Sequence, residues 1–480
     1  MILNILVEMP IPKEILAVKR PSSTVVKRRG ERFVVIKRTS KRKDGRVIPV
    51  DLGCVGEIIN GEFVEGTIKK RKKTVDIKDY GEVAICNKVG QPLIQELARV
   101  WDMSTAKRLY VISLLRAAFG DIKNRDLQLH YETSFASEFY PGVHLSEQAV
   151  SKFLMELGQG YSLICEFMRS RVKNYIGENI IIDGMLKDYN SQCSSLSEFS
   201  RKGVKKGSKD ISIMYAFDPK SKEPIAARAY PGNVLDQRAV DSFVADFEIN
   251  KGMMILDKGF WKEAFLEKVD STEQLSYLIP MKRNSAYVTS YGMDNPTAHL
   301  VGYKDRTILY KKVQMKNGTF LYSFRDPKMA YEQEINYVEK VEKKAKFDEA
   351  NYELKKKSFG LIVFRSKADL TPLDVYTAYA KRWEIETMFN LLKNIIDRDT
   401  VNVHNDYRAY ATEFINFLSV IISMRVKREF VQKGIDKQYS YKQIFKYLSK
   451  YKKVKIDSSD IWIDVTLLKY IEKLVEILEV

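Results

Sequence analysis

Two aspartates occupy positions that suit metal-ion chemistry. Asp183 follows the apolar run 180–182, Asp257 follows the apolar run 254–256, and a glycine comes soon after each aspartate. Each run predicts a buried strand, and the ends of such strands meet at the crevice of an open sheet. Hard divalent cations such as Mg²⁺ prefer carboxylate oxygens as ligands. Aspartate at a strand end also commonly caps a turn, so either residue taken alone leaves both interpretations open.

A third carboxylate lies in a segment with a helical pattern. Thr371 followed by Pro372 predicts a helix start. If the helix continues at about 100° per residue, one stripe of it carries a phenol, two cations and a carboxylate. These residues are Tyr379, Arg382, Glu386 and Lys393. Glu384 points to the other side of such a helix and is the poorer ligand candidate. An ordinary amphipathic helix with a charged exterior has the same pattern.

The elements around these carboxylates predict an α/β fold. Strand patterns cover 179–183, 210–217, 223–230, 253–257 and 275–281, and helical patterns cover 236–247 and 261–269. This order favours a mixed sheet covered by helices. The alternation stops at 284, where a hairpin around Asn317-Gly318 and a charged helical run over 326–357 predict an insertion. A strand at 359–365 then returns to the sheet, and the rest of the chain is mainly helical.

The N-terminal segment alternates short β-rich runs with turn signals. The runs 32–37 and 46–50 flank Lys43-Asp44-Gly45, and Asn60-Gly61 predicts a second turn. Ten basic residues and two acidic ones lie between Lys27 and Arg46, and a further basic cluster occupies 69–73. This composition predicts either a small β module that binds the DNA backbone or a solvated, flexible arm.

Residues 92–175 show helical periodicity, with Ser146 as a predicted N-cap. Such short helices could form a helix-turn-helix DNA reader, although amphipathic helices more often belong to a protein core.

Composition narrows the classes of partner. The chain has 480 residues, 80 Lys and Arg against 62 Asp and Glu, and a net charge of +18. This excess favours a polyanionic partner, although a protein from a lysine-rich organism would have the same net charge.

The sequence predicts neither a membrane span nor a cross-linked scaffold. The longest apolar stretch, 414–424, contains Asn416 and Ser419 and is too short to cross a bilayer. Four scattered cysteines fit a reducing compartment and predict neither a disulfide scaffold nor a structural zinc site.

Together these residues carry a resemblance to a known family. The spacing of Tyr379, Arg382, Glu386 and Lys393 resembles the YREK signature of bacterial insertion-sequence DDE transposases. Asp183-Gly184 after an apolar strand and the motif Asp257-Lys-Gly-Phe260 resemble the first and second aspartate motifs of the same group. The resemblance covers about 179–430 and includes the segment 230–233. Met185 and Lys262 differ from the residues common at these positions in the group. These differences affect the assignment to a subgroup, because neither residue is an expected metal ligand.

The resemblance implies a ribonuclease H-like catalytic domain with a β-rich insertion. We therefore expect a basic β module over 1–88, a helical DNA-binding region over 89–176 and a catalytic domain over 177–283 and 359–430. The insertion would cover 284–358, and a C-terminal helical region would cover 431–480.

The resemblance also implies Mg²⁺-dependent cut-and-paste transposition. Asp183, Asp257 and Glu386 would hold two Mg²⁺ ions, with Mn²⁺ as a substitute and Asp183 as the bridge. Arg382 and Lys393 would bind phosphates, and Tyr379 would donate its hydroxyl group to the DNA backbone. Further expected DNA contacts are Lys202, Lys205, Lys206, Lys209, Lys282 and Arg283. The expected partners are terminal inverted repeats, target DNA and a second copy of the chain, with no membrane. The expected location is the bacterial cytoplasm, in association with the nucleoid.

Two other functions fit the same residues. A DNA-binding protein descended from a transposase would bind transposon ends without cleaving them. A ribonuclease H-like nuclease would nick DNA but would never join a 3′-end to target DNA.

Overall fold

The computed structural model describes residues 10–29, 32–43, 46–66, 75–175, 178–200, 203, 205–234, 236–303, 307–343, 347–394, 401–456 and 461–480. The chain forms two compact units. The first comprises 1–76 and 455–460, and the second comprises 77–454 and 461–480.

The first unit is an antiparallel sheet with strand order β1-β2-β3-β4. Its elements are α1 (Lys13–Ala17), β1 (Thr24–Arg29), β2 (Arg32–Lys43), β3 (Arg46–Ile59) and β4 (Glu62–Glu65). The predicted turn at Asn60-Gly61 is confirmed, because both residues have positive φ angles, 51° and 82°, and β3 pairs with β4 around them. The register Lys43↔Arg46 confirms the other hairpin. The basic cluster at 69–73 lies outside the described residues.

The second unit begins with helices, as the periodicity over 92–175 predicts. They are α2 (Gly81–Gly90), α3 (Pro92–Leu97), α4 (Met103–Phe119), η1 (Asn124–Asp126), α5 (Leu127–Glu132), α6 (Ala136–Phe139), α7 (Glu147–Gln159) and α8 (Tyr161–Tyr175). Ser146 caps α7, because its hydroxyl group accepts a hydrogen bond from the Ala149 backbone N–H at 3.4 Å. The N-cap prediction is therefore confirmed.

A nine-stranded mixed sheet follows, with strand order β11-β12-β13-β14-β10-β9-β6-β7-β8. The strands are β6 (Asn179–Asp188), β7 (Asp210–Asp218), β8 (Glu223–Pro231), β9 (Gly252–Leu256), β10 (Leu275–Pro280), β11 (Ala298–Leu300), β12 (Ile308–Gln314), β13 (Phe320–Arg325) and β14 (Leu361–Ser366). The helices around it are α9 (Asp236–Asp246), η2 (Lys258–Phe260), α10 (Glu263–Asp270), α11 (Ala286–Ser290), α12 (Pro327–Glu342), α13 (Glu349–Lys356), α14 (Pro372–Ala380) and α15 (Trp383–Asn394). The α/β class with a mixed sheet is confirmed.

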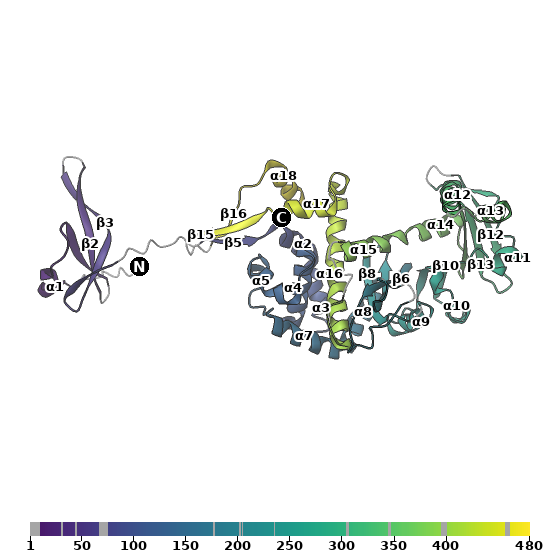
Figure 1. Cartoon of the computed structure of the whole chain (residues 1–480), viewed down its shortest axis with the longest axis horizontal. Helices are drawn as coiled ribbons and strands as arrows, with labels where there is room; N and C mark the ends of the chain where they lie inside the picture. The colour runs from purple at the N-terminus through teal and green to yellow at the C-terminus, as the bar shows by residue number, and fades with distance from the viewer. Residues whose placement is uncertain are drawn as a thin grey trace. The chain divides into compact units, whose positions relative to one another are not determined.

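The predicted insertion contributes strands to this same sheet. β12 and β13 form the expected hairpin, with Gln314 opposite Phe320, and β13 pairs with the returning strand β14. The segment 284–358 therefore extends the sheet through main-chain hydrogen bonds, and α12 and α13 follow the hairpin (Figure 1). The domain boundaries that we predicted within this unit remain a proposal.

One long helix, α16 (Asp406–Gln432), lies at the centre of the second unit (Figure 1). It packs against α2, α4 and α7 on one side and against β8 on the other. Within the described residues it alone is long and apolar enough to cross a membrane, yet 89% of its most apolar window is buried inside the protein. The helix is thus longer than the apolar stretch 414–424, and its apolar residues form core.

The chain ends with η3 (Ile435–Lys437), α17 (Tyr441–Leu448), β15 (Lys452–Ile456), β16 (Ile463–Asp464) and α18 (Lys469–Leu478). β15 lies between β16 and the earlier strand β5 (Val75–Asp79) in a three-stranded sheet.

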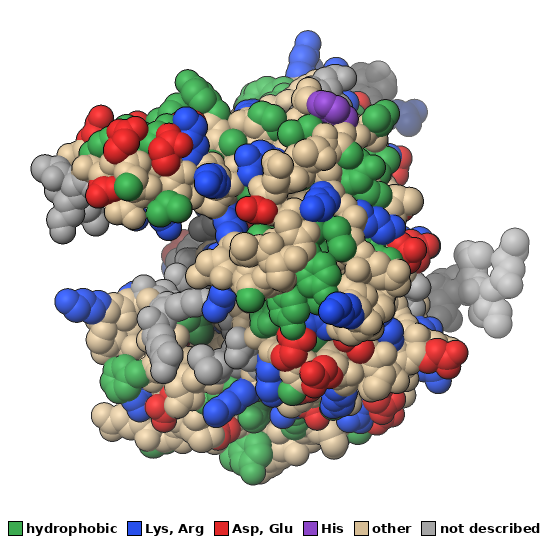
Figure 2. Space-filling view, turned by 90° about the vertical axis from the view of Figure 1, so that its right-hand side faces the viewer, with side chains coloured by type: hydrophobic (Ala, Val, Ile, Leu, Met, Phe, Trp, Pro, Cys, Tyr) green, Lys and Arg blue, Asp and Glu red, His purple; other side chains and the backbone are tan. Residues whose placement is uncertain are grey.

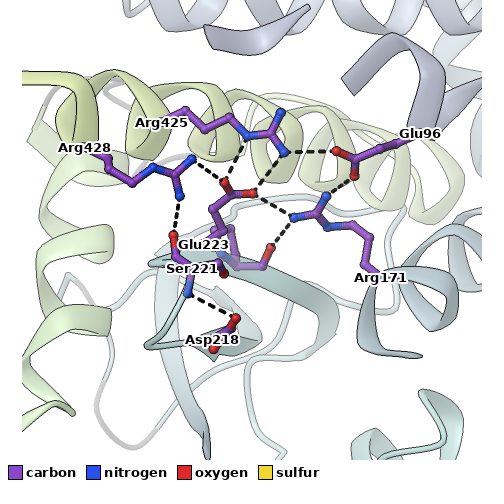
Figure 3. Close-up of polar contacts among 8 residues, drawn as sticks. Glu96, Arg171, Asp218, Ser221, Glu223, Arg425 and Arg428 are labelled. Carbon is purple, nitrogen blue, oxygen red and sulfur yellow. Dashed lines mark hydrogen bonds and ion pairs between the residues drawn. The ribbon is translucent and has the colours of Figure 1, made fainter. Parts of the chain in front are cut away.

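A buried ion network ties the helices to the sheet (Figure 3). The carboxylate of Glu223, on β8, bonds Arg425 of α16 at 3.0 and 3.1 Å and Arg171 of α8 at 3.1 Å. Both arginines also bond Glu96 of α3. Although burial alone would raise it, the pKa of Glu223 is lowered because Arg425, Arg171 and Arg428 surround the carboxylate.

Candidate active site

The two predicted aspartates are neighbours across a parallel strand pair. β6 and β9 run in parallel, with Ile181 opposite Ile255 and Ile182 opposite Leu256. Asp183 and Asp257 are the next residues along the two strands. This register therefore brings them side by side, just beyond the last residue pair of β6 and β9. Neighbouring strands lie about 4.8 Å apart, which places the two carboxylates within reach of a shared cation.

Glu386 approaches the same place from α15, which packs against β6. The guanidinium of Arg382 connects it to the first aspartate: one nitrogen lies 3.1 Å from Asp183 Oδ2 and another 2.8 Å from Glu386 Oε1. Since one planar guanidinium bonds both carboxylates, Asp183 and Glu386 face each other across it. The three acidic residues, far apart in the sequence, therefore converge at one place.

Burial and like charges shape the electrostatics of this site. Burial raises the pKa of Asp183 to about 6; Asp257 and Glu386 add to the rise, while the Gly184 amide and Arg382 oppose it. The Gly184 N–H donates to Asp183 Oδ1 at 2.8 Å. Three carboxylates with one balancing arginine form a site that a divalent cation would stabilise.

Tyr379 lies beside the same arginine. The Arg382 guanidinium carbon is 5.6 Å from the centre of the Tyr379 ring, and that ring packs against Phe364 of β14 at 4.6 Å. Burial raises the pKa of Tyr379, against the effect of Arg382 and with a further rise from Asp257 and Asp183. The phenol therefore stays protonated and can donate a hydrogen bond.

Two expectations about local structure were wrong. Asp183 does not end its strand, because β6 continues to Asp188 through antiparallel pairing with β7. The helix from 371 is not continuous either: α14 ends at Ala380 and α15 starts at Trp383. Hydrogen bonds from Arg382 N–H to the Tyr379 carbonyl and from Ile385 N–H to the Arg382 carbonyl replace the i→i−4 pattern there. The predicted helix start is confirmed, since the Thr371 hydroxyl group accepts from Asp374 N–H at 3.1 Å.

Lys393 lies two turns beyond Glu386 on α15, on the same side of the helix. Its side chain is exposed, and no hydrogen bond or ion pair joins it to another residue of the described ranges. Glu384 faces away, with an oxygen 3.9 Å from Lys222 Nζ. The role of Lys393 stays a prediction.

The other expected DNA contacts lie in varied settings. Lys202 is outside the described residues, Lys206 and Lys282 are exposed, and Lys209 lies 5.6 Å from the ring centre of Phe199. Lys205 is 2.7 Å from Asp188. Arg283 donates to the Leu361 carbonyl at 2.8 Å and to Gln333 at 3.2 Å, contacts that hold the insertion to β14. On the face drawn in Figure 2, basic side chains are scattered among acidic and apolar ones.

Sequence reasoning missed a pocket beside the carboxylates. It has a volume of ≈ 640 Å³ and is lined by Tyr379 and Arg382 together with Tyr303, Tyr376 and Trp383. Trp383 is 70% exposed, which is unusual for a tryptophan. Its position directly after Arg382 was a signal in the sequence, but Tyr303 comes from the insertion and only the fold brings it here.

The donor chemistry fits a hard divalent cation, because the converging side chains offer carboxylate oxygens alone. In the arrangement described, the guanidinium of Arg382 takes the place of a cation between Asp183 and Glu386. Across the described ranges, no three acidic, histidine or cysteine side chains are grouped closely enough to hold a metal ion as they stand. A cation held by both Asp183 and Glu386 would occupy the place that the Arg382 guanidinium takes here.

Comparison with known proteins identifies the family. Residues 179–422 match the family described as "Transposase DDE domain", which is half of the chain. The chain belongs to this transposase family. The matched segment contains all three carboxylates and the sheet that positions them.

The transposase is also similar to a solved structure, the cryo-EM structure of a piggyBac transposase synaptic complex with hairpin DNA. The sequence identity is 12% and the TM-score is 0.40, over 76% of this chain and 79% of that one. No curated protein matches the sequence of the transposase.

Proposed function

We propose that this transposase cleaves and joins transposon-end DNA by metal-dependent phosphodiester hydrolysis and strand transfer, in a cut-and-paste reaction. The observation that supports this proposal is the convergence of Asp183, Asp257 and Glu386 around Arg382, from two neighbouring strands and a helix. A structural role alone would not require three partly exposed carboxylates together at the end of the β6–β9 pairing.

Asp183, Asp257 and Glu386 would hold two Mg²⁺ ions, or Mn²⁺ in their place, with Asp183 shared. When bound, such a pair stabilises both the attacking and the leaving oxygen of an in-line displacement at phosphorus. The protein would preorganise the site, because the sheet and one helix hold the three carboxylates in position before DNA binds.

The basic and aromatic residues would position the DNA. A phosphate beside the scissile bond offers Arg382 a bidentate partner, which would draw its guanidinium away from Asp183 and Glu386. Lys393 would bind a neighbouring phosphate, and the protonated Tyr379 would donate to a backbone oxygen. Trp383, exposed at the rim of the adjoining pocket, would offer a stacking surface for a base.

The partners in this proposal are terminal inverted repeats and target DNA, and the net charge of +18 supports binding to a polyanion. Two transposon ends must be held together for excision, so we propose a homodimer in the synaptic complex. The proposed location is the bacterial cytoplasm, in association with the nucleoid.

The test uses the full chain, Mg²⁺ and duplex DNA containing the ends of the element that encodes it. We expect nicking or excision at those ends. Asp183→Asn, Asp257→Asn and Glu386→Gln should each lower the cleavage rate by about a hundredfold or more, because each removes a ligand charge. Binding of the same DNA without metal should persist in all three variants.

Glu384→Gln is the matched control, since it neutralises a carboxylate on the same helix that faces Lys222 instead of the site. It should retain cleavage, and circular dichroism should show that all variants fold. Cleavage that survives the three site substitutions would refute the assignment. Tight binding with no cleavage in either Mg²⁺ or Mn²⁺ would favour a DNA-binding descendant, and nicks without joining would favour a nuclease.

A further inference from the structure

The first unit carries a two-stranded arm with no core of its own. The buried apolar side chains described in this unit, Val26, Val34, Val35, Ile36 and Ile58, all lie at one end of the sheet. Beyond Arg38, β2 pairs only with β3, from Arg38↔Asp51 to Lys43↔Arg46. The arm comprises 38–43 and 46–51, and none of the residues 38–42 and 46–51 is buried. A lone two-stranded ribbon is marginally stable in water, so an arm of this kind needs either a partner or a strong anchor.

The base of the arm is anchored to the unit. Lys27 and Arg38 lie 2.8 and 2.7 Å from the carboxylate of Asp51, and these contacts lower the pKa of Asp51 to about 2. Two register shifts, at Val35/Ile36 and Lys37/Arg38, separate the core from the arm. Such bulges bend and twist a ribbon. The arm therefore starts from a fixed point and projects beyond the core.

The outer part of the arm is basic. Lys41, Arg42 and Arg46 are exposed, and none of their side chains has a hydrogen bond or ion pair with any other residue that the structure describes. Three other cations of the unit have acidic partners: Lys27 and Arg38 pair with Asp51, and Arg32 lies 3.8 Å from Glu57. Unpaired cations on both strands of one ribbon complement a polyanion.

Aliphatic side chains lie among these cations. Val47 is opposite Arg42 and Ile48 is opposite Lys41, and their side chains are 63% and 44% exposed. Directly opposite residues share a face of a ribbon, whereas neighbours along a strand point to opposite faces, so Lys41, Arg46 and Ile48 lie on one face and Arg42 and Val47 on the other. Pro49 follows and lacks an N–H, which discourages the open edge from pairing with another strand.

We infer that the β2–β3 arm is a DNA-binding element that lies in the major groove of duplex DNA, with Lys41, Arg42 and Arg46 on phosphates and base edges and Ile48, whose face also carries Lys41 and Arg46, on thymine methyl groups. The major groove, about 12 Å wide, admits a two-stranded ribbon, whereas the minor groove is about half as wide. Thymine methyl groups are exposed only in the major groove and accept apolar contacts. The arm belongs to the first unit and the three carboxylates to the second, so the inference holds whether or not the proposed cleavage is correct.

The first experiment measures the affinity of the full chain for a short labelled duplex by fluorescence anisotropy, in EDTA and at several KCl concentrations. Lys41→Gln combined with Arg42→Gln should lower the slope of log affinity against log salt by about 2, because two phosphates are no longer neutralised. The matched control is Lys13→Gln with Lys19→Gln, which removes the same charge from exposed positions of the same unit. It should leave the slope unchanged. Equal slopes for the two double variants would overturn the inference.

The second experiment tests the groove. Replacing thymine by uracil in the duplex removes the methyl groups and should weaken binding by about fourfold for each thymine methyl group that the arm covers. Ile48→Ser should bind the thymine duplex more weakly and show no response to uracil, whereas Val47→Ser, on the opposite face, is the matched control and should keep that response. Both side chains are exposed, so folding should be unaffected, which circular dichroism checks. A uracil effect that is absent in the unmodified protein, or undiminished in Ile48→Ser, would refute binding in the major groove.

Discussion

At the scale of single residues, surroundings decide what a carboxylate does. Asp183 is partly buried beside two other carboxylates, and burial with those like charges raises its pKa to about 6. Glu223 is more completely buried, yet its pKa is lowered because three arginines surround it. The carboxylate of Asp183, with one neighbouring arginine, can still bind a cation, whereas the carboxylate of Glu223 is already neutralised by the arginines that hold the helices to the sheet. The amino-acid type alone does not distinguish them.

Glu82, on α2, gives a pH-dependent prediction. Burial, and then the charge of Asp79, raise its pKa to about 8 from a usual value of 4.5, against the opposing effect of Lys452 and Lys450. The folded protein therefore holds this proton more tightly than the unfolded chain does. Stability from this group is fully present below pH 4.5 and is lost as the pH rises to about 8. Glu82→Gln should be nearly neutral at pH 5 and should stabilise the protein by a few kcal/mol at pH 9, as measured by thermal melting.

The control for this prediction is Glu267→Gln, which changes an exposed carboxylate of α10. It should shift the melting temperature equally at both pH values. A Glu82→Gln variant whose effect does not grow with pH would show that Glu82 is ionised in the folded protein at neutral pH.

At the scale of elements, the close approach of two helices determines which residue fits at their contact. Gly158 in α7 faces the start of α16, and a Cβ atom added there would lie 1.9 Å from the Tyr407 carbonyl oxygen. The obstacle is backbone, so it cannot rotate away. Glycine is therefore required by packing and not by its own φ angle, in a helix where alanine would otherwise be preferred.

Gly158→Ala should lower the free energy of unfolding by about 1–3 kcal/mol, although alanine gains up to about 1 kcal/mol in helix propensity. Chemical denaturation provides the measurement. Gly160→Ala is the matched control, because the nearest atom to its added Cβ is 3.5 Å away and its φ is −81°. If both variants were equally stable, α7 and α16 could separate without cost, and the tight packing would not contribute to stability.

At the scale of the whole molecule, the ion network around Glu223 makes the helices and the sheet of the second unit one structure. It joins α3, α8 and α16 to β8, so the predicted helical region and the predicted catalytic domain share a buried centre (Figure 3). Side chains from the helical region, Arg171 and Glu96 among them, therefore help to hold in place the sheet that carries the candidate site.

Glu223→Gln should destabilise the second unit by about 3–5 kcal/mol, because it leaves buried guanidinium groups without their central anion. Helical circular dichroism and tryptophan fluorescence should report one shared shift in the denaturation midpoint. Arg428→Gln is a milder change, since Arg428 is 36% exposed, and should cost about 1 kcal/mol. Separate transitions in the two signals would mean that the network does not couple the helices to the sheet.

Much of the fold followed from local patterns. The hairpins at Asn60-Gly61 and Asn317-Gly318, the N-caps Ser146 and Thr371 and the strand-helix order of the sheet all depend on neighbours within a few residues. The break between α14 and α15 did not follow, because Arg382 leaves the regular helix while it bonds Asp183, which is remote in sequence. The extension of β6 beyond Asp183 likewise depends on pairing with β7.

The sequence by itself determined which residues have the chemistry: acidic groups after apolar runs, a stripe of phenol, cation and carboxylate, and a basic N-terminal ribbon. These are properties of residue type and short spacing. The tertiary structure alone decided that Asp183 and Asp257 are neighbours, that Arg382 lies between Asp183 and Glu386, and that Tyr303 reaches the same pocket. The reason is physical: strand register and long-range packing arise from the burial of the whole core, which no local window contains.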